Sequence, residues 1–321
     1  MAASRRPRCV IADPRDDGHG PAAPVACDVA RRAVACHLDA VWRAIEIAAS
    51  DRGDTEAMHR LRVACRRSLA VLEAFQPILP RSGRKWFVTR LRLIKRSAGK
   101  ARDLDVMNDR LVAGSHRVGE AHGVAVSARR ALLETLRRER RTAREPVATL
   151  HRRLRNAGWQ ARATKLQGSV QRTGIGAWTL PRYARRRLRP VLARFQQRAD
   201  HRMRGGRDIH RFRIEGRRLR YLVEVFSTIF SERVRRRCER AMGRLQSDLG
   251  EFTDHAAAAD RLGWLFSRTA ERGSRQMVKR LLRRERDDAK RVGRACRRQW
   301  RRSHRQNLSR TITKAVRKAT A

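Results

Sequence analysis

Two short segments of the chain combine one histidine with several arginines at helical spacing. Residues 59–67 read HRLRVACRR, and residues 210–218 read HRFRIEGRR. Arginine presents a planar fork of N–H donors that matches two oxygens of a phosphate group, and histidine gains positive charge below about pH 6.5. Segments of this composition could therefore bind phosphate groups.

The two segments belong to a longer internal repeat with a constant offset of 151 residues. Without any gap, the same offset pairs Glu73 with Glu224 and Asp103 with Asp254. Chance matches between arginines are expected in a chain so rich in arginine, but chance does not explain the His, Glu and Asp matches. The sequence therefore predicts a tandem duplication.

In each segment the apolar residues and the cations fall on different faces of a helix. With Leu61 at 0° and about 100° per residue, Cys65, Leu72, Phe75 and Leu79 lie within about 40° of it. His59, Arg62 and Arg66 fall between about 100° and 160°, on a separate stripe. The second copy repeats this pattern, so one face of each helix packs while another presents cations.

Like charges one helical turn apart repel each other by roughly 0.2 to 0.5 kcal/mol per pair, so two such stripes suggest an anion that offsets the repulsion. Arginines about 5.4 Å apart can follow a chain of phosphates. The alternative is a solvated basic face. Each histidine could instead ligate a metal, or act as a capping or core hydrogen-bonding group. Glu73 and Glu224 could orient nearby arginines or pair within their own helices, as Arg220 and Glu224 would.

No set of residues typical of catalysis accompanies the stripes. Asp103, Asp105 and Asp109 could form an acidic magnesium motif, but Ala256 stands at the position that corresponds to Asp105, so helix capping is the better interpretation. The motifs lack a second metal ligand at suitable spacing, and the sequence lacks a nucleophile with its acid and base, a Gly-rich phosphate loop and a cofactor fingerprint. We therefore expect a non-enzymatic protein without a metal or cofactor.

The charge of the chain also points to an anionic partner. Its 321 residues include 78 Lys and Arg against 31 Asp and Glu, which gives a formal net charge of +47, and 41% of the residues are hydrophobic. The positive charges of so basic a chain repel one another, which favours binding to nucleic acid, an anionic membrane surface or polyphosphate. No segment approaches the roughly 18 apolar residues of a membrane span. The six separated cysteines lack zinc-finger spacing and indicate thiols in a reducing cytoplasm.

Helical periodicity dominates the chain, and strand-like alternation is almost absent, which predicts an all-α fold. We expect two similar halves of about four helices each. The predicted organisation is a disordered leader (1–26), a first helical bundle (27–158), an irregular connector (159–178) and a second helical bundle with a very basic C-terminal helix (179–321). Within the first half, a helix over residues 84–98 is expected to end at Gly99, and Asp103 is expected to cap another helix.

These motifs resemble the conserved histidine α-helical domain, or CHAD, family. The resemblance rests on both His–Arg segments, on Glu224 and on residues 99–106 (GKARDLDV), and it spans about residues 28–310. It implies two four-helix bundles, related by a pseudo-twofold axis, around a basic groove or pore that binds inorganic polyphosphate. It also implies a cytoplasmic location and, in some members, association with polyphosphate or polyhydroxyalkanoate storage granules.

Carried over position by position, the resemblance assigns phosphate contacts to both motifs and to Lys95 and Arg102 of neighbouring helices. The contacts from the motifs are His59, Arg62, Arg66, Arg67, His210, Arg213, Arg217, Arg218 and Arg220. Arg217 stands where many members have lysine, a change that retains the charge. Many members also carry a triphosphate-tunnel domain, and nothing like it is found in this sequence, so we expect a stand-alone binding module.

A sequence-nonspecific, architectural nucleic-acid-binding protein is the alternative, because the net charge supports it equally well. Phosphate contacts weaken with salt in either case. Aromatic residues make up only 5% of the chain, and the stripes contain none besides Phe212, on the packed face, and Tyr221. Single-strand binders stack bases on exposed rings. The sequence therefore favours polyphosphate over nucleic acid, and it leaves chain length and oligomeric state open.

Overall fold

The computed structural model describes residues 24–50, 55–115 and 123–320. These residues form ten α helices and three short 3-10 helices, and their only β pairing is a single bridge between Val25 and Thr179. The prediction of an all-α fold is therefore confirmed. The predicted disordered leader lies almost entirely outside the described residues.

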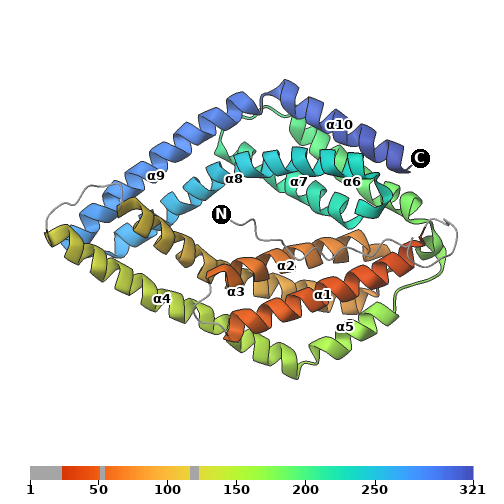
Figure 1. Cartoon of the computed structure of the whole chain (residues 1–321), viewed down its shortest axis with the longest axis horizontal. Helices are drawn as coiled ribbons and strands as arrows, with labels where there is room; N and C mark the ends of the chain where they lie inside the picture. The colour runs from red at the N-terminus through yellow and green to blue at the C-terminus, as the bar shows by residue number, and fades with distance from the viewer. Residues whose placement is uncertain (1–23, 51–54, 116–122, 321) are drawn as a thin grey trace.

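The helices follow one another in the same order in both halves (Figure 1). The first half contains α1 (Ala26–Ser50), α2 (Thr55–Ala74), α3 (Arg81–Ser115), α4 (Gly123–Asn156) and α5 (Trp159–Gly168). The second half contains α6 (Leu180–Asp200), α7 (Gly206–Val225), α8 (Glu232–Arg268), α9 (Arg272–Gln299) and α10 (Arg302–Thr320). Both ends of α2 and α7 are related by the 151-residue offset, and so are the 3-10 helices η2 (Gln76–Ile78) and η4 (Ser227–Ile229) that follow them. The repeat in the sequence is thus also a repeat of secondary structure.

The two halves lie side by side and touch in two main places (Figure 1). α2 contacts α7 toward the right of Figure 1, and α4 contacts α9 at the left end, where the long helices converge. Helices α2, α3, α7 and α8 border the region between these two contacts (Figure 1). The segments with the His–Arg stripes therefore lie on helices that face the middle of the molecule.

Each half contains five α helices within the described residues, one more than predicted. In the first half the additional helix is α5, which occupies the first part of the segment expected to be irregular. α5 follows Gly158, whose φ of 69° favours glycine and lets the chain turn after α4. Its Trp159 and Leu166 are buried, so α5 adds apolar contacts to the first half. Only the rest of the connector, around the 3-10 helix η3 (Gly174–Ala177), lacks α-helical structure.

The single helix α3 replaces the two helices predicted on either side of Gly99. It continues through Gly99 and Asp103, so the expected C-cap and N-cap are both wrong. Its buried face continues through Ile94 and Ala101 on the two sides of the glycine. Packing along this face offsets the roughly 1 kcal/mol that a glycine costs inside a helix.

One large apolar core runs through both halves, and a smaller one closes the far end. The large core includes Phe75 of the first half and Phe226 of the second. The small core joins Met107 and Leu136 with Leu262, among others. Apolar contacts therefore fasten the two halves at both places where they meet.

Most of the cysteines that the structure describes are buried thiols, as the sequence indicated. Cys27, Cys65, Cys238 and Cys296 are free and buried, whereas Cys36 is disulfide-bonded, which departs from the expectation of six thiols. Within the described ranges, no helix combines the length and the apolar character that a membrane span requires.

A buried ion cluster fastens α3 to α4. Asp105 is fully buried, and its Oδ1 accepts hydrogen bonds from Arg140 Nε at 2.8 Å and from Arg144 Nη2 at 3.3 Å. Away from water, the carboxylate and the two guanidiniums compensate each other's charge. Removal of the carboxylate would leave the positive charges of Arg140 and Arg144 uncompensated. Asp105 therefore connects two long helices and does not cap one.

Replacing Asp105 with alanine should lower the free energy of unfolding by about 3 to 5 kcal/mol, because it leaves buried positive charge uncompensated. The exposed Asp109, one turn further along α3, provides a matched control whose replacement should cost less than about 0.5 kcal/mol. Urea unfolding followed by circular dichroism measures both variants. Equal, small losses in the two variants would contradict the role given to Asp105.

Candidate functional site

Helices α2 and α7 bring the two His–Arg segments into one region, because the two helices contact each other directly. The start of α7 is held by its own first turn. The Asp208 carboxylate accepts hydrogen bonds from the backbone N–H of Arg204 at 2.9 Å and of Gly205 at 3.3 Å. This N-terminal cap fixes the turn that carries His210.

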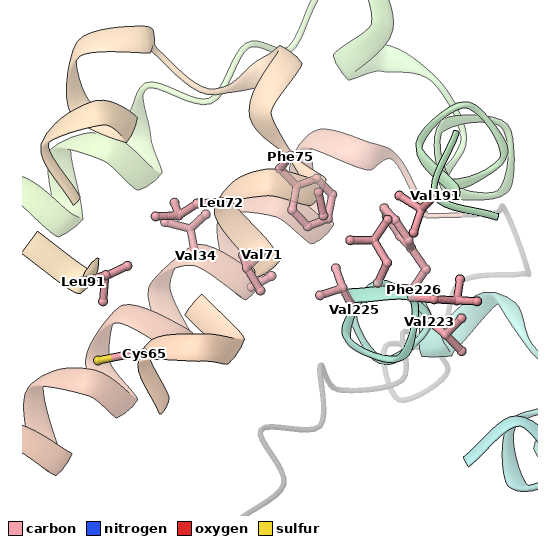
Figure 2. Close-up of a cluster of buried hydrophobic side chains, with 14 of the residues drawn as sticks. Val34, Cys65, Val71, Leu72, Phe75, Leu91, Val191, Val223, Val225 and Phe226 are labelled. Atoms are coloured by element: carbon pink, nitrogen blue, oxygen red, sulfur yellow. The ribbon is translucent and has the colours of Figure 1, made fainter. Parts of the chain in front are cut away.

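The kind of contact that α2 and α7 make with each other changes along their length. The C-terminal ends share an apolar core, where Phe75 lies edge-on to Phe226 with ring centroids 5.7 Å apart. Figure 2 shows Val71 of α2 and Val225 of α7 turned toward this contact. Two ion pairs each join an arginine from the middle of one helix to a glutamate in the last turn of the other, and the N-terminal halves carry most of the cations. The cations therefore lie toward the N-terminal end of each helix, and the shared core lies at its C-terminal end.

Two reciprocal ion pairs connect α2 with α7. Arg67 Nη2 donates a hydrogen bond to Glu224 Oε1 at 2.7 Å, and Arg218 donates one to Glu73. The 151-residue offset converts one pair into the other, so each half offers an arginine and a glutamate to its counterpart. The two glutamates therefore pair between the halves, and not within their own helices as one interpretation of the sequence suggested.

Five cations from three helices share one electrostatic neighbourhood, which we call the cation cluster. They are Arg62 and Arg66 of α2, Lys95 of α3, and Arg213 and Arg217 of α7. Partial burial lowers the pKa of Arg217, and the positive charges of Arg213 and Arg66 lower it further. Burial also lowers the pKa of Lys95, and the positive charges of Arg217 and Arg66 lower it further. Each helix thus experiences the cations of the other, which means that the two stripes face a common region.

Two aspartates neutralise part of the cation cluster. Asp103 of α3 lies 3.6 Å from Arg62 Nη1 and also forms an ion pair with Arg261 of α8. Burial lowers the pKa of Arg213, and the Asp254 carboxylate opposes this shift. Asp103, which was expected to cap a helix, therefore pairs with Arg62 of one stripe, and the charge of Asp254 acts on Arg213 of the other.

The other three cations, Arg66, Arg217 and Lys95, have no carboxylate partner among the described residues. Within the same part of the chain, Nε of Arg66 and Nε of Arg213 are buried without a hydrogen-bond partner. Holding like charges together partly out of water costs free energy, because the protein screens them less than water does. An anion with several charged groups would offset that cost.

His59 and His210 stand at the start of the two stripes. Partial burial lowers the pKa of His210, and the charges of Arg213 and Arg217 lower it further. Partial burial also lowers the pKa of His59, with Glu56 opposing the shift. Near neutral pH both imidazoles are therefore uncharged and can donate one N–H to a phosphate oxygen. Among the described residues, no three His, Cys, Asp or Glu side chains are grouped so that they could hold a metal ion.

The remaining predicted contact residues lie around the cation cluster and not in it. Arg67 and Arg218 are held in the ion pairs between the halves. Arg102 Nη2 lies 3.9 Å from Glu56 Oε1, at the edge of the cation cluster, and its charge adds to the effects of burial and Arg66 in lowering the pKa of Arg62. Arg220 lines a separate pocket. The structure thus separates cations that the resemblance had grouped together.

One residue of the site was missed by the sequence reasoning. Arg261 reaches Asp103 from the second half, which adds a further ion pair between the halves. The repetition of Asp103 as Asp254 was the signal available in the sequence. It marked the acidic positions as part of the repeated unit but gave no indication of the partner.

Comparisons with known proteins give one matching family and similar solved structures. The family model of the CHAD domain matches residues 32–263. The crystal structure of the CHAD domain from the plant Ricinus communis has a TM-score of 0.66 and 17% identity, covering 92% of this chain and 97% of that one. PptA from Streptomyces chartreusis has a TM-score of 0.60 and 18% identity, covering 89% of this chain and 100% of that one. A search of curated proteins gives no match. These solved structures share the fold of the chain.

The histidine titrations test the electrostatics of the site. In the free protein both His59 and His210 should titrate below 6.5, because burial and the nearby guanidiniums disfavour the imidazolium. Proton NMR of the imidazole signals, assigned with His59→Gln and His210→Gln, measures both midpoints. As a control, Arg217→Gln should raise the midpoint of His210, because it removes a neighbouring positive charge. Midpoints at or above 6.5 in the unmodified protein would contradict the cation cluster.

Proposed function

We propose, since this chain belongs to the CHAD domain family, that it binds inorganic polyphosphate at the cation cluster. The observation that carries the proposal is the meeting of cations from both halves at one place. Arg66 of α2 and Arg217 of α7 each lack a carboxylate partner among the described residues, and each influences the same neighbourhood. A single polyanion can neutralise both.

The composition of the cluster fits a chain of phosphates better than a single phosphate. Arginine forks bind phosphate oxygens bidentately, and lysine adds a point charge. Arg62 and Arg66 are about 6 Å apart along the axis of α2, and further cations come from α3 and α7. A linear anion can contact several of these cations in succession, whereas one phosphate group is too small to do so.

Binding without chemical conversion is part of the proposal. The sequence offers no nucleophile with its acid and base, and the site consists of arginine, lysine and neutral histidine side chains. We further propose a role in storing, targeting or retaining polyphosphate in the cytoplasm, on polyphosphate or polyhydroxyalkanoate granules, without a metal or cofactor. The support for this role is the family and the charge of the chain, +47.

Removal of the cluster arginines should abolish tight polyphosphate binding while the chain remains helical. The test variant replaces four arginines with glutamine: Arg62, Arg66, Arg213 and Arg217. A control variant loses the same charge from exposed positions of α6 and α10: Arg185, Arg189, Arg310 and Arg317. Fluorescence anisotropy with labelled polyphosphate at fixed salt should show at least about a hundredfold weaker binding for the test variant, since each charged contact contributes roughly 1.5 to 3 kcal/mol. The control should lose far less.

The same measurement distinguishes polyphosphate from nucleic acid. Unlabelled polyphosphate should displace the labelled chain at a lower phosphate concentration than duplex DNA or RNA does, and the recovered polyphosphate should keep its length. If polyphosphate binding weakened equally in the test and control variants, the cation cluster would not be the binding site. Displacement by DNA as effective as that by polyphosphate would favour the nucleic-acid alternative.

A further inference from the structure

A separate pocket lies between α7 and α8, on one side of the contact between α2 and α7. Within it, the centres of water molecules can occupy about 140 Å³. A cavity of about 150 Å³ measured in this way can hold a benzene-sized molecule. The pocket is therefore large enough for a small organic ligand.

The pocket reflects a difference between the two halves. Its floor includes Cys238 and Met242, which correspond through the 151-residue offset to Phe87 and Leu91 of α3. Phe87 is buried and lies edge-on to Trp159 with centroids 4.9 Å apart, so an aromatic ring fills that space in the first half. At the corresponding position of the second half, the shorter Cys238 lines the pocket.

The rim of the pocket carries three guanidiniums and two carboxylates. Arg67 is held by Glu224 in the ion pair between the halves, and Glu239 is the other carboxylate. Arg220 and Arg235 form no ion pair among the described residues. The rim thus has a surplus of one positive charge. Such a surplus suits one negative charge, whereas the two carboxylates would repel a chain of phosphates.

One of the two guanidiniums without an ion pair is specific to the second half, whereas Arg235 corresponds to Arg84 of the first half. Arg220 corresponds to Leu69, so the first half has an apolar residue at that position. Beneath the rim the pocket is lined by the apolar side chains of Val223, Cys238 and Met242, of which Val223 is the most accessible, at 6%. One wall therefore offers free guanidiniums and another offers an apolar surface.

We propose that this pocket binds a small organic carboxylate. Arg220 and Arg235 hold the carboxylate group, and its apolar part packs against Val223, Cys238 and Met242. Carboxylates fit the guanidinium fork, and an apolar body of about benzene size fits the volume. The site is distinct from the cation cluster, so this inference does not depend on the binding of polyphosphate.

Ligand-detected NMR and calorimetry with the full chain test the proposal. The probes are benzoate and butyrate, with benzamide and butylammonium as neutral and cationic controls, all at low salt. Benzoate or butyrate should bind saturably at one site. The two controls lack the negative charge and should bind at least about tenfold more weakly, a difference of about 1.4 kcal/mol. Arg220→Leu, which introduces the first-half residue, should weaken carboxylate binding to a similar degree.

Two further variants fill the pocket with residues of the first half. Cys238→Phe should abolish carboxylate binding while polyphosphate binding stays unchanged. Ser227→Gln, at the rim, takes the place of this variant if the larger ring impairs folding, and circular dichroism checks both. Absence of saturable carboxylate binding in the unmodified chain would overturn the proposal. So would unchanged carboxylate binding in a folded variant whose pocket is filled.

Discussion

The reciprocal ion pairs between α2 and α7 are the interaction on which the remainder of the structure depends. Arg67 pairs with Glu224, and Arg218 pairs with Glu73, so each pair joins the middle of one helix to the last turn of the other, next to the shared apolar core. Partly exposed ion pairs contribute no more than about 1 kcal/mol each, so the core beside them supplies most of the stability. The pairs instead fix the register, because each requires one residue from each half. That register brings the two stripes together.

Assembly of the cation cluster has an energetic cost that other parts of the fold offset. Arg66 and Arg217 are partly buried and lack carboxylate partners among the described residues, while the chain as a whole carries a charge of +47. Asp103 and Asp254 reduce the repulsion, and apolar cores at both contacts between the halves resist it. An anion that binds only the folded state adds stability in proportion to its concentration and affinity. Polyphosphate binding would therefore also stabilise the fold.

Much of the fold and part of the site could be predicted from the sequence. Helical periodicity identified the all-α class and the stripes, because these are local properties of single helices. The constant offset identified the repeat. The partners of Glu73 and Glu224 could not be predicted, since positions on a helical wheel do not show which other helix lies opposite. The cap assigned to Asp103 failed for a similar reason: packing along the buried face of α3 outweighs the local preference of Gly99 to end a helix. The pocket beside Cys238 depends on side-chain volumes that only the packed structure compares.

The most direct test of a site shared by both halves is the stoichiometry of polyphosphate binding in single variants. Calorimetry with a short polyphosphate of uniform length should give one chain per protein. Arg66→Gln and Arg217→Gln should each weaken that one binding event as a whole, because both guanidiniums contact the same anion. If each stripe instead bound its own chain, the unmodified protein would take up two. Either variant would then keep half of the capacity at the original affinity, and that result would contradict a common site between the two halves.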